Sequence, residues 1–525
     1  MLNNIVIRIN RSTTSIVTKT RWASGTTILA GSSLSRKTYS IDAAYRDLRD
    51  IMRERGPADD VISKSNLDNN ADHRISRSDP ILENAAQDAS SYTMKRPDLS
   101  LVPTCVEQIS ECVKYCYAND IPMVPVGART GLEGGIHAMR GGVSFDMSQM
   151  KRLLQVNESD LDCHVEAGLS WRELNDQIRS TGLWFPVDPG ADASLGGMAS
   201  TSASGTNAVK YGTMRENVLG LEVVTRDGKV ITTAGTKCRS KKSSAGLNLT
   251  NLFVGSEGTL GVISSVRLKL HALPSNMAVV TVAFPTVNEA VESVVQVMQC
   301  GLPVARIEFL DQPGVSACYQ DSKLPNLDPN LPMLFIELHA LTKSGLDDQV
   351  DILQDIFESQ GASNFNWSSK QEERTQLWKA RHNLHWSILK TKPGFANIDT
   401  DVCVPISRFP EMVAISHELI DKFGLDAPLM GHAGDGNFHS VILYDPKLPG
   451  EFEKAKQLGI EMGRVAIKLE GTVTGEHGVG RGKMDLIEEQ FDDCTLETMY
   501  AIKLALDPKN LFNPDKVFKA DNMGV

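Results

Sequence analysis

Apolar and polar residues follow two patterns along this chain, and the first runs from residue 104 to residue 270. Short apolar stretches there alternate with glycine-rich loops. Apolar residues at helical spacing from Val106 to Tyr117 predict a helix, and Thr104 and Glu107 have the spacing of a capping box at its start. The apolar stretches predict strands at residues 121–126, 143–147, 161–167 and 262–270.

Turn signals and small residues refine this first region. A second capping box begins at Ser170 and predicts a helix that ends at Gly182. The Asp227-Gly228 pair separates two apolar stretches, which predicts a β-hairpin. Residues 198–205 are almost all small, so we expect the backbone there to approach another element or a ligand closely.

The second pattern begins after residue 274, where strand and helix patterns alternate more regularly. This alternation predicts a second, α+β domain. Strands are predicted at 278–283, 306–310, 334–339 and 398–404, and helices at 289–299, 346–359, 371–389 and 408–423.

Length, charge and cysteine content narrow the class of protein. At 525 residues the chain is too long for one hydrophobic core, so we expect two or three domains. The net charge of -11 gives no support for a nucleic-acid surface, and no apolar stretch reaches the length of a membrane span. The nine cysteines are scattered, which favours reduced thiols in an intracellular compartment.

The N-terminal segment has a different composition from the rest. No Asp or Glu precedes Asp42, while Arg, Lys, Ser and Thr are frequent. This composition is typical of a mitochondrial transit peptide, which we place at residues 1–35, and it predicts a mitochondrial protein. A disordered basic tail is the alternative.

One glycine-rich loop follows directly from a predicted strand. Residues 127–135 come after the strand at 121–126, and bare backbone N–H groups in such a loop can approach an anion closely. The loop does not open a helix with Rossmann spacing, so the dinucleotide fingerprint is not met. The pattern therefore indicates either a phosphate cradle or a long glycine turn.

Histidines and a glutamate occur among glycines near the C-terminus. His432 and His439 lie in the stretch 431–439, and Glu476 and His477 lie in 474–478. Imidazole and carboxylate ligands suit zinc, manganese or iron. His432 and His439 lie seven residues apart in a stretch with three glycines, and we expect neither helical nor strand periodicity to put them on one face. The glycines must therefore turn the backbone for the rings to converge. The alternative is a glycine-rich turn with satisfied polar side chains.

Taken together, these stretches resemble the mitochondrial FAD-dependent D-lactate dehydrogenases of the cytochrome type, within the vanillyl-alcohol-oxidase or PCMH-type flavoproteins. The resemblance covers roughly residues 95–520, a length over which several motifs occur in order. Its carriers are residues 125–135, 189–197, 243–246, 255–261 and 377–382 and the two histidine stretches.

The resemblance implies an α+β fold of several parts. A PCMH-type FAD-binding domain is expected at 96–274, preceded by a helical and irregular segment at 36–95. An α+β, ferredoxin-like cap domain for the substrate is expected at 275–480, and it carries the metal site. A helical C-terminal segment, 481–525, is expected to return to the FAD domain.

The family also implies which residues contact a noncovalent FAD. They are Pro125, Gly127, Ala128, Arg129, Thr130, Gly131, Gly134, Pro189, Gly190, Ser194, Gly196, Gly197, Ser204, Gly205, Gly261, Val262 and Asn513. Arg129 departs from the family pattern, because a glycine usually stands there. A positive φ would strain this arginine, whereas its guanidinium could instead pair with the pyrophosphate. Asp515 also replaces a usual glycine.

For the chemistry, we expect His432, His439 and Glu476 to hold a divalent metal, zinc or manganese. His477 would be the general base, and Arg381 would clamp the substrate carboxylate by a two-point contact. Asn437 would also contact the substrate. The alternative for Arg381 is a salt bridge on a helix surface.

The resemblance implies oxidation of D-lactate to pyruvate, with electrons passed to cytochrome c or a similar mitochondrial carrier. Within the same family the substrate could instead be D-2-hydroxyglutarate or glycolate. Two alternatives belong to other classes. One is a metal-dependent hydrolase without flavin, and the other is a non-catalytic flavin-binding subunit.

Overall fold

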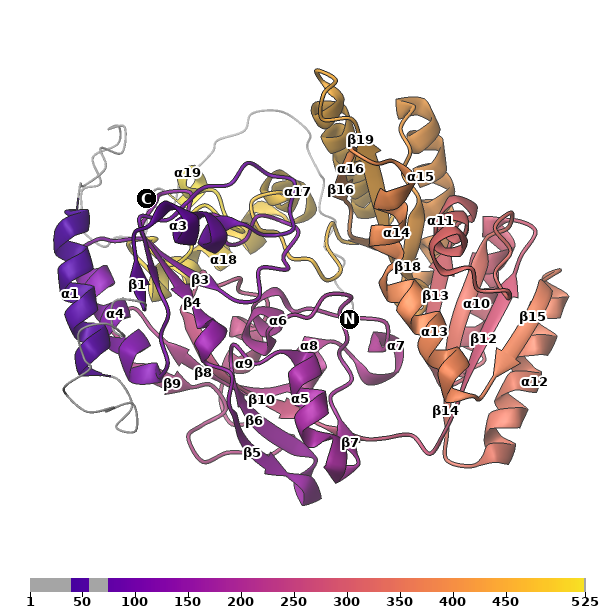
Figure 1. Ribbon diagram of the computed structural model, residues 1–525, viewed down its shortest axis with the longest axis horizontal. Helices are drawn as coiled ribbons and strands as arrows, with labels where there is room; N and C mark the ends of the chain where they lie inside the picture. The colour runs from indigo at the N-terminus through magenta and orange to yellow at the C-terminus, as the bar shows by residue number, and fades with distance from the viewer. Residues whose placement is uncertain (1–38, 56–73, 524–525) are drawn as a thin grey trace, which may run out of the picture. The chain divides into compact units, whose positions relative to one another are not determined.

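The computed structural model describes residues 39–55 and 74–523 (Figure 1). The expected transit peptide at residues 1–35 lies outside these residues. The chain divides into two units, Met1–Thr38 and Tyr39–Val525, and everything below concerns the second unit. Among its described residues, no helix is both long enough and apolar enough to span a membrane.

The first region contains two larger sheets that share one hydrophobic core, and a two-stranded sheet of β7 (Leu183–Trp184) and β11 (His271–Ala272). In the four-stranded sheet, β1 (Ile75–Ser76) is antiparallel to β2, and β2 (Leu99–Leu101) and β3 (Met123–Val126) both run parallel to β4 (Val143–Asp146). The five-stranded sheet is antiparallel, in the order β5-β6-β10-β8-β9. Its strands are β5 (Leu153–Asn157), β6 (Asp162–Glu166), β8 (Val218–Val224), β9 (Val230–Thr232) and β10 (Val262–Lys269).

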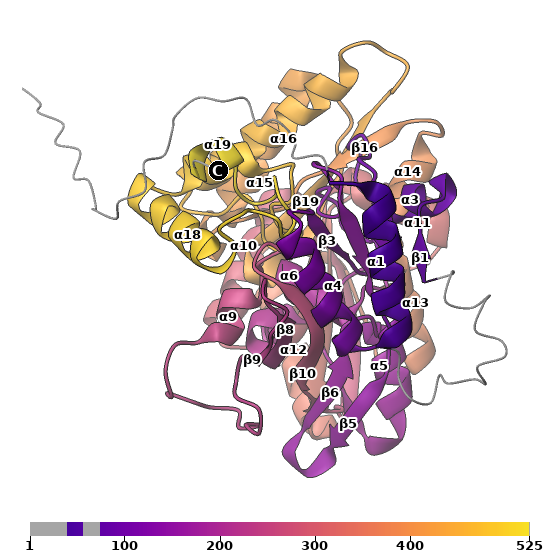
Figure 2. The ribbon, with the colours of Figure 1, turned by 90° about the vertical axis from the view of Figure 1, so that its left-hand side faces the viewer.

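Helices α1 (Ile41–Glu54) and α4 (Val106–Ala118) lie side by side next to the four-stranded sheet (Figure 2). The predicted capping box of α4 is wrong. The N-cap is Cys105, and the Gln108 side chain instead accepts a hydrogen bond from the Thr104 amide at 2.8 Å. The box at Ser170 is present at the start of α5 (Trp171–Ile178).

The second region is built on one long antiparallel sheet, ordered β15-β12-β14-β13-β18-β19-β16. Its first half is a βαββαβ unit with strand order 4-1-3-2, which is ferredoxin-like. The elements are β12 (Asn276–Ala283), α10 (Val287–Gln299), β13 (Val304–Leu310), β14 (Met333–Ala340), α12 (Lys343–Ser359) and β15 (Ser363–Ser368).

The second half of this sheet begins where β13 pairs with β18 (Leu429–His432). β18 then pairs with β19 (Asn437–Tyr444), which pairs with β16 (Ala396–Asp399) and β17 (Val402–Cys403). The predicted strand 398–404 is therefore two strands, because Thr400 and Asp401 interrupt the pairing.

The two faces of the long sheet are covered by different helices. α10, α12, α15 (Phe409–Phe423) and α16 (Glu451–Lys468) pack on one face. α11 (Gln312–Ser322), α13 (Gln371–His382) and α14 (Leu384–Thr391) pack on the other. The predicted helix 371–389 is thus two helices that meet at Asn383, and α13 brings Arg381 to the second face.

The chain returns to the first region at its C-terminal end. After α17 (Met484–Gln490) and α18 (Asp493–Leu506), Phe512 forms a parallel bridge with Met123 of β3. The Asn513 amide N–H donates to the Met123 carbonyl at 2.7 Å. The Asn513 side chain donates to the carbonyls of Gly135 and Glu257, which places it beside the glycine-rich loop.

Candidate active site

A cavity of about 610 Å³ is lined by the glycine-rich loops of the first region and by the sheet and loops of the second. The predicted FAD contacts that line it are Pro125, Gly127, Ala128, Arg129, Thr130, Gly131, Pro189, Gly190, Ser194, Gly196, Gly197, Gly261 and Asn513. The second region contributes Arg381, His432, His439, Glu476 and His477, among others. Residues far apart in the sequence therefore meet in one cavity.

Four residues predicted to contact FAD do not line the cavity, and their contacts with FAD stay predictions. Val262 is fully buried in the core on β10, and its neighbour Ile263 reaches the cavity instead. Gly205 packs against Asp188, and Gly134 packs against Arg481. Ser204 is buried behind the wall, although its neighbour Ala203 lies on it.

The glycines give this cavity room for a phosphate-bearing cofactor. A Cβ atom at Gly131, Gly135 or Gly190 would meet no atom within 4 Å, so these backbones border open space. A Cβ at Gly127 would lie 2.4 Å from Oγ of Ser194, so a side chain there would displace that hydroxyl. The cavity volume falls within the ~300–1,000 Å³ of ligand sites, and bare amides suit an anion. The residues present fit FAD.

Arg129 has the positive φ expected to strain it, at 62°. Its guanidinium forms an ion pair with Asp146 at the end of β4. The proposed pairing with a pyrophosphate is therefore not the contact that the structure shows, although Arg129 does line the cavity.

His432 and His439 are brought together by a β-hairpin. β18 ends at His432, a turn follows, and β19 begins at Asn437, with Gly436 at φ 74°. His439 lies opposite Met430, and His432 lies opposite Asn437. Residues paired in this way share one face of a sheet, so both imidazoles point to the same side. This confirms that the glycine-rich stretch turns the backbone.

The three predicted metal ligands converge on one point. Nε2 of His432 and Nε2 of His439 lie 3.0 and 3.1 Å from Oε1 of Glu476. Nδ1 of His432 donates to Glu308 at 2.7 Å, and Nδ1 of His439 donates to the Thr400 carbonyl at 3.2 Å.

The hydrogen bonds of the two Nδ1 atoms determine the protonation of the two Nε2 atoms that face Glu476. Because each Nδ1 faces an acceptor, it carries the proton, and each Nε2 is left with its lone pair. Two nitrogen lone pairs and a carboxylate oxygen then face one another, which is stable only with a cation or a proton between them. Oε2 of Glu476 is also buried without a hydrogen-bond partner among residues 39–55 and 74–523. This donor set fits zinc or manganese.

The electrostatics of the three groups agree with that geometry. Burial lowers the pKa of His432, but the facing carboxylates of Glu308 and Glu476 outweigh it and raise that pKa well above its usual value. Burial raises the pKa of Glu476, but His432 and His439 outweigh it and hold that pKa below its usual range. The site therefore favours positive charge between the ligands.

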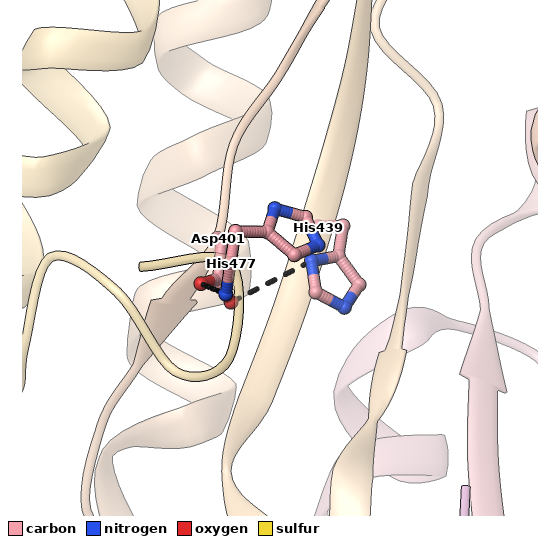
Figure 3. A group of neighbouring side chains, drawn as sticks. All are labelled: Asp401, His439 and His477. Carbon is pink, nitrogen blue, oxygen red and sulfur yellow. Dashed lines mark hydrogen bonds and ion pairs between the residues drawn. The ribbon is translucent and has the colours of Figure 1, made fainter. Parts of the chain in front are cut away.

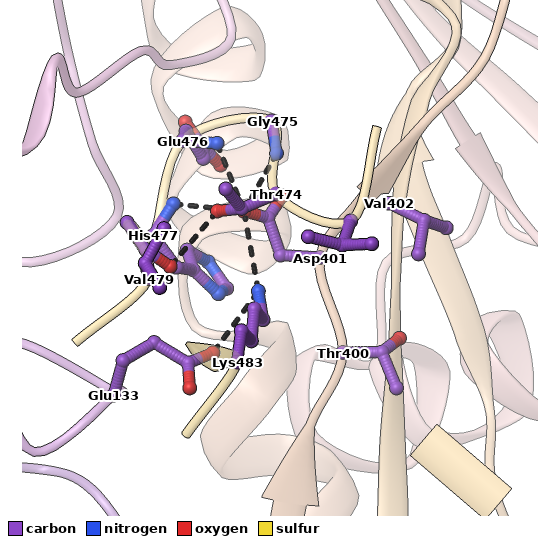
Figure 4. A network of polar contacts seen from close by, with 12 residues as sticks. Glu133, Thr400, Asp401, Val402, Thr474, Gly475, Glu476, His477, Val479 and Lys483 are labelled. Carbon is purple, nitrogen blue, oxygen red and sulfur yellow. Dashed lines mark hydrogen bonds and ion pairs between the residues drawn. The ribbon is translucent and has the colours of Figure 1, made fainter. Parts of the chain in front are cut away.

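Asp401, His439 and His477 form a neighbouring cluster of potential ligands (Figure 3). Oδ2 of Asp401 is already occupied, because it accepts from Oγ1 of Thr474 and from the amides of residues 475–477 at 2.7–2.9 Å. Nζ of Lys483 lies 3.7 Å away (Figure 4). Asp401 is therefore a loop anchor, and the positive charge of Lys483 disfavours a metal there.

His477 lines the cavity beside the ligand set. Its ring stacks on His439 with centroids 4.7 Å apart. Burial lowers the pKa of His477 to about 4, so the ring is neutral near pH 7. Its Nδ1 is buried and has no hydrogen-bond partner within the described chain. The arrangement provides a neutral imidazole that can accept a proton.

Arg381 is a buried residue of the cavity wall, so the expected surface alternative is wrong. Its side chain is 8% exposed, and Nη2 lies 2.6 Å from Oε2 of Glu308. Nε has no hydrogen-bond partner among the residues that the structure describes. The guanidinium therefore keeps donor capacity for an anion.

Asn437 uses its side-chain nitrogen within the protein. Its Nδ2 donates to Oδ1 of Asp401 at 2.8 Å and to the Val402 carbonyl at 2.9 Å, and the residue does not line the cavity. The amide nitrogen holds Asp401, while Oδ1 has no hydrogen-bond partner among the described residues, and the expected substrate contact stays a prediction.

Sequence reasoning missed several charged residues around the site. Glu308, Asp401 and Glu257 are buried carboxylates that hold the ligands or the loop at 474–480. Glu308 lies between apolar residues in a predicted strand, and a charge on the buried face of a strand is rare unless it is paired. That signal could have identified Glu308.

The sequence of this chain is similar to those of known proteins. Residues 97–234 match the FAD binding domain, and residues 273–517 match the C-terminal domain of FAD linked oxidases. A probable mitochondrial D-lactate dehydrogenase of Danio rerio is 44% identical over 449 residues, which cover 85% of this chain and 90% of that protein. The mitochondrial D-lactate dehydrogenase (cytochrome) of Arabidopsis thaliana is 38% identical over 458 residues, covering 87% of this chain and 78% of that protein.

A solved structure supports the fold. The 4-ethylphenol oxidase from Gulosibacter chungangensis matches with a TM-score of 0.73 at 15% identity, over 93% of this chain and 99% of that chain. The expected α+β fold, with a PCMH-type FAD-binding domain and a second domain, is confirmed.

Proposed function

This chain belongs to the FAD-linked oxidases, in the family of the mitochondrial D-lactate dehydrogenases, and from that premise we propose that it oxidises D-lactate to pyruvate. One observation carries the proposal. Arg381, His477 and the His432, His439 and Glu476 set line a single cavity with the glycine loops of the FAD-binding region. In this assignment residues 96–274 bind FAD, residues 275–480 form the substrate domain, and residues 481–525 return to the FAD domain.

Each polar group has a task that suits its surroundings. Arg381 binds the substrate carboxylate with the donors that Glu308 leaves available, and this fixes which face of the substrate is presented. His477 accepts the hydroxyl proton, since its imidazole is neutral and its Nδ1 is unpartnered among the described residues. When bound, FAD supplies the hydride acceptor and a zinc or manganese ion held by His432, His439 and Glu476 makes the hydroxyl more acidic.

The electron acceptor and the location follow from the relatives. The Arabidopsis thaliana protein is named as cytochrome-linked and mitochondrial, and the Danio rerio protein as mitochondrial. We infer that this chain also works in mitochondria and passes electrons to cytochrome c or a similar carrier. The acid-poor composition before Asp42 supports import.

A visible-light spectrum of the purified protein tests the proposal. A flavin band that bleaches on adding D-lactate without oxygen is the expected result. A band that persists supports the non-catalytic flavin-binding subunit, and the lack of a band supports the metal-dependent hydrolase. The same titration is repeated with glycolate and D-2-hydroxyglutarate. If either compound bleaches the flavin faster than D-lactate does, that compound is the preferred substrate.

A further inference from the structure

Glu308 is a fully buried carboxylate that contacts two different parts of the active site. It lies on β13 directly opposite His432 of β18 in the sheet register. Its Oε1 accepts a hydrogen bond from Nδ1 of His432 at 2.7 Å, and its Oε2 lies 2.6 Å from Nη2 of Arg381. One side chain therefore contacts both a metal ligand and the proposed substrate anchor.

We propose that Glu308 is a positioning residue that sets the metal ligand His432 and the substrate anchor Arg381 together. The part concerning Arg381 rests on the proposed function. Glu308 does not line the cavity, so it acts through these two neighbours and not by touching the substrate.

The contact with His432 fixes the tautomer of that ring. A carboxylate accepts hydrogen bonds only, so Nδ1 must carry the proton and Nε2 must present its lone pair to the site. Nε2 is the atom that lies 3.0 Å from Glu476. Without the carboxylate, the ring is free to adopt the other tautomer or to rotate, and either change removes a ligand atom.

The contact with Arg381 fixes the direction of the guanidinium. The ion pair with Glu308 holds Nη2, while Nη1 contacts Sδ of Met430 at 3.7 Å. These two contacts fix the orientation of the planar guanidinium at the end of a flexible side chain. Its Nε has no hydrogen-bond partner among the described residues. A two-point grip on a carboxylate needs this orientation before the substrate arrives.

The same sheet contains a matched control residue. Glu337 lies on β14, next to β13, and is also a buried glutamate that contacts a histidine and an arginine. Its Oε1 bonds Nε2 of His339 at 2.7 Å and lies 3.9 Å from Nε of Arg306. Its Oε2 also accepts a hydrogen bond from Nε1 of Trp378, on the same helix as Arg381. Glu337 touches neither His432 nor Arg381, so Glu337→Gln reports the effect of disturbing a buried charge near α13 while both contacts of Glu308 remain.

The test compares Glu308→Leu, which removes both acceptor oxygens, with Glu337→Gln on the FAD-loaded protein. Dissociation constants for Zn²⁺ and Mn²⁺ are measured by chelator competition, and the dissociation constant for pyruvate by its perturbation of the flavin spectrum. We expect Glu308→Leu to weaken metal binding about 10–100-fold. We also expect it to weaken pyruvate binding about tenfold or more, including at saturating Mn²⁺.

The result at saturating metal separates a double role from a single one. If pyruvate affinity returns fully once the metal site is filled, Glu308 acts on His432 alone and the proposal is overturned. It is also overturned if both constants stay within about twofold of the wild type, as we expect for Glu337→Gln.

A second variant covers the case in which Glu308→Leu does not fold. Glu308→Gln keeps the volume but has one acceptor oxygen, so it can satisfy only one of the two neighbours. We expect a defect in metal binding or in pyruvate binding, and the absence of both defects overturns the proposal. If D-lactate does not bleach the wild-type flavin, the proposed function fails, and the metal constants still decide whether Glu308 holds His432.

Discussion

Arg129 shows how one residue can depart from a family pattern without changing the fold. Its left-handed backbone conformation costs an L-residue about 1–2 kcal/mol relative to glycine. The guanidinium offsets part of that cost through its ion pair with Asp146, which is only 10% exposed. The arginine is thus engaged by the protein itself.

We therefore expect Arg129→Gly to keep FAD affinity within about threefold, and to change the free energy of unfolding by no more than about 1 kcal/mol. The variant gains stability because glycine is not strained at a positive φ. It loses stability because the ion pair with Asp146 is absent and because glycine has greater conformational entropy in the unfolded chain. Arg129→Ala is the control, because it loses the ion pair but keeps the strain, and it should be less stable than the glycine variant. FAD titration and thermal unfolding measure both effects. A tenfold loss of FAD affinity in both variants would show that the guanidinium binds the pyrophosphate.

His477 is the residue that the proposed reaction needs for proton transfer. His477→Ala should lower kcat by about 10²–10⁴-fold, the usual contribution of a general base, while the protein stays yellow. Stopped-flow bleaching of the flavin measures the step directly. His164→Ala is the control, since that histidine bonds Ser265 in the FAD-binding region. Near-normal bleaching in His477→Ala would assign the proton to another group.

Arg381 gives a prediction that separates charge from shape. Arg381→Lys keeps one positive charge but has no planar fork, so it cannot hold Glu308 and a carboxylate in the same geometry. We expect KM to rise and kcat to fall, with kcat/KM reduced about 10–100-fold, the value of a charged hydrogen bond. Lys379→Arg, an exposed change on the same helix, should leave both constants unaltered. Unchanged kinetics in Arg381→Lys would remove this residue from substrate binding.

At the scale of elements, the loop at 474–480 is held from both sides by buried carboxylates. Asp401, between β16 and β17, accepts from the amides of residues 475–477. Glu257, from the FAD-binding region, accepts from the amides of Val479 and Gly480 at 2.7 Å. Backbone anchoring therefore helps to position Glu476 and His477, in addition to the contacts of their side chains.

Asp401→Asn should loosen this loop, because the amide cannot accept from the same four donors. We expect the free energy of unfolding to fall by about 3–5 kcal/mol, as when a buried charged group loses its partners, together with weaker binding of Zn²⁺. Glu257→Gln should act on the same loop, so the double variant should lose less than the sum of the two. Chemical denaturation and metal titration measure these changes, and Asp227→Asn in an exposed turn is the control. Full additivity would mean that the two carboxylates hold independent segments.

Some residues of this site were predicted from the sequence, whereas the buried carboxylates that hold them were not. His432, His439, Glu476 and His477 stood out because imidazoles among glycines are uncommon as packing. Glu308 did not, since its partner His432 is 124 residues away and only the β13–β18 pairing joins them. Asp401 is similar, 76 residues from His477.

Some boundaries of helices were predicted wrongly for a related reason. The apolar pattern of 371–389 continues through Asn383, so periodicity alone cannot detect the break between α13 and α14. The predicted capping box at Thr104 had the right spacing, but Gln108 competes for the same amide. Long periodic strands such as β10 and β12 were found because tertiary contacts and local pattern agree there.

At the scale of the whole molecule, the FAD-binding region and the substrate domain are joined by a buried ion pair. Nη2 of Arg306 on β13 lies 3.2 Å from Oδ2 of Asp188, and its Nε donates to Oδ1 of Asn207 at 2.9 Å. The guanidinium also stacks over Trp378 of α13, 4.5 Å from the ring centroid. Asp188 directly precedes Pro189 and Gly190 of the cavity wall.

This ion pair links the cofactor loop to the helix that carries the substrate anchor. Asp188 is 3% exposed and also accepts from Oγ1 of Thr206 at 2.7 Å, so its charge depends on the protein for compensation. Burial raises the pKa of Asp188, but Arg306 outweighs it and holds that pKa below its usual value. Removing Arg306 would leave a buried carboxylate with weaker partners beside the FAD loop.

We expect Arg306→Ala to lower the free energy of unfolding by about 3–5 kcal/mol, the cost of breaking a buried ion pair from one side. FAD should be released before the protein unfolds, because the loop after Asp188 loses its attachment to β13 and α13. Flavin fluorescence follows release while circular dichroism follows unfolding, so the two midpoints can be compared in one heating experiment. Arg408→Ala removes an exposed ion pair with Glu411 and should cost no more than about 1 kcal/mol. The prediction is contradicted if FAD release and unfolding of Arg306→Ala share one midpoint, at the wild-type temperature. That result would mean that other contacts hold the two regions together.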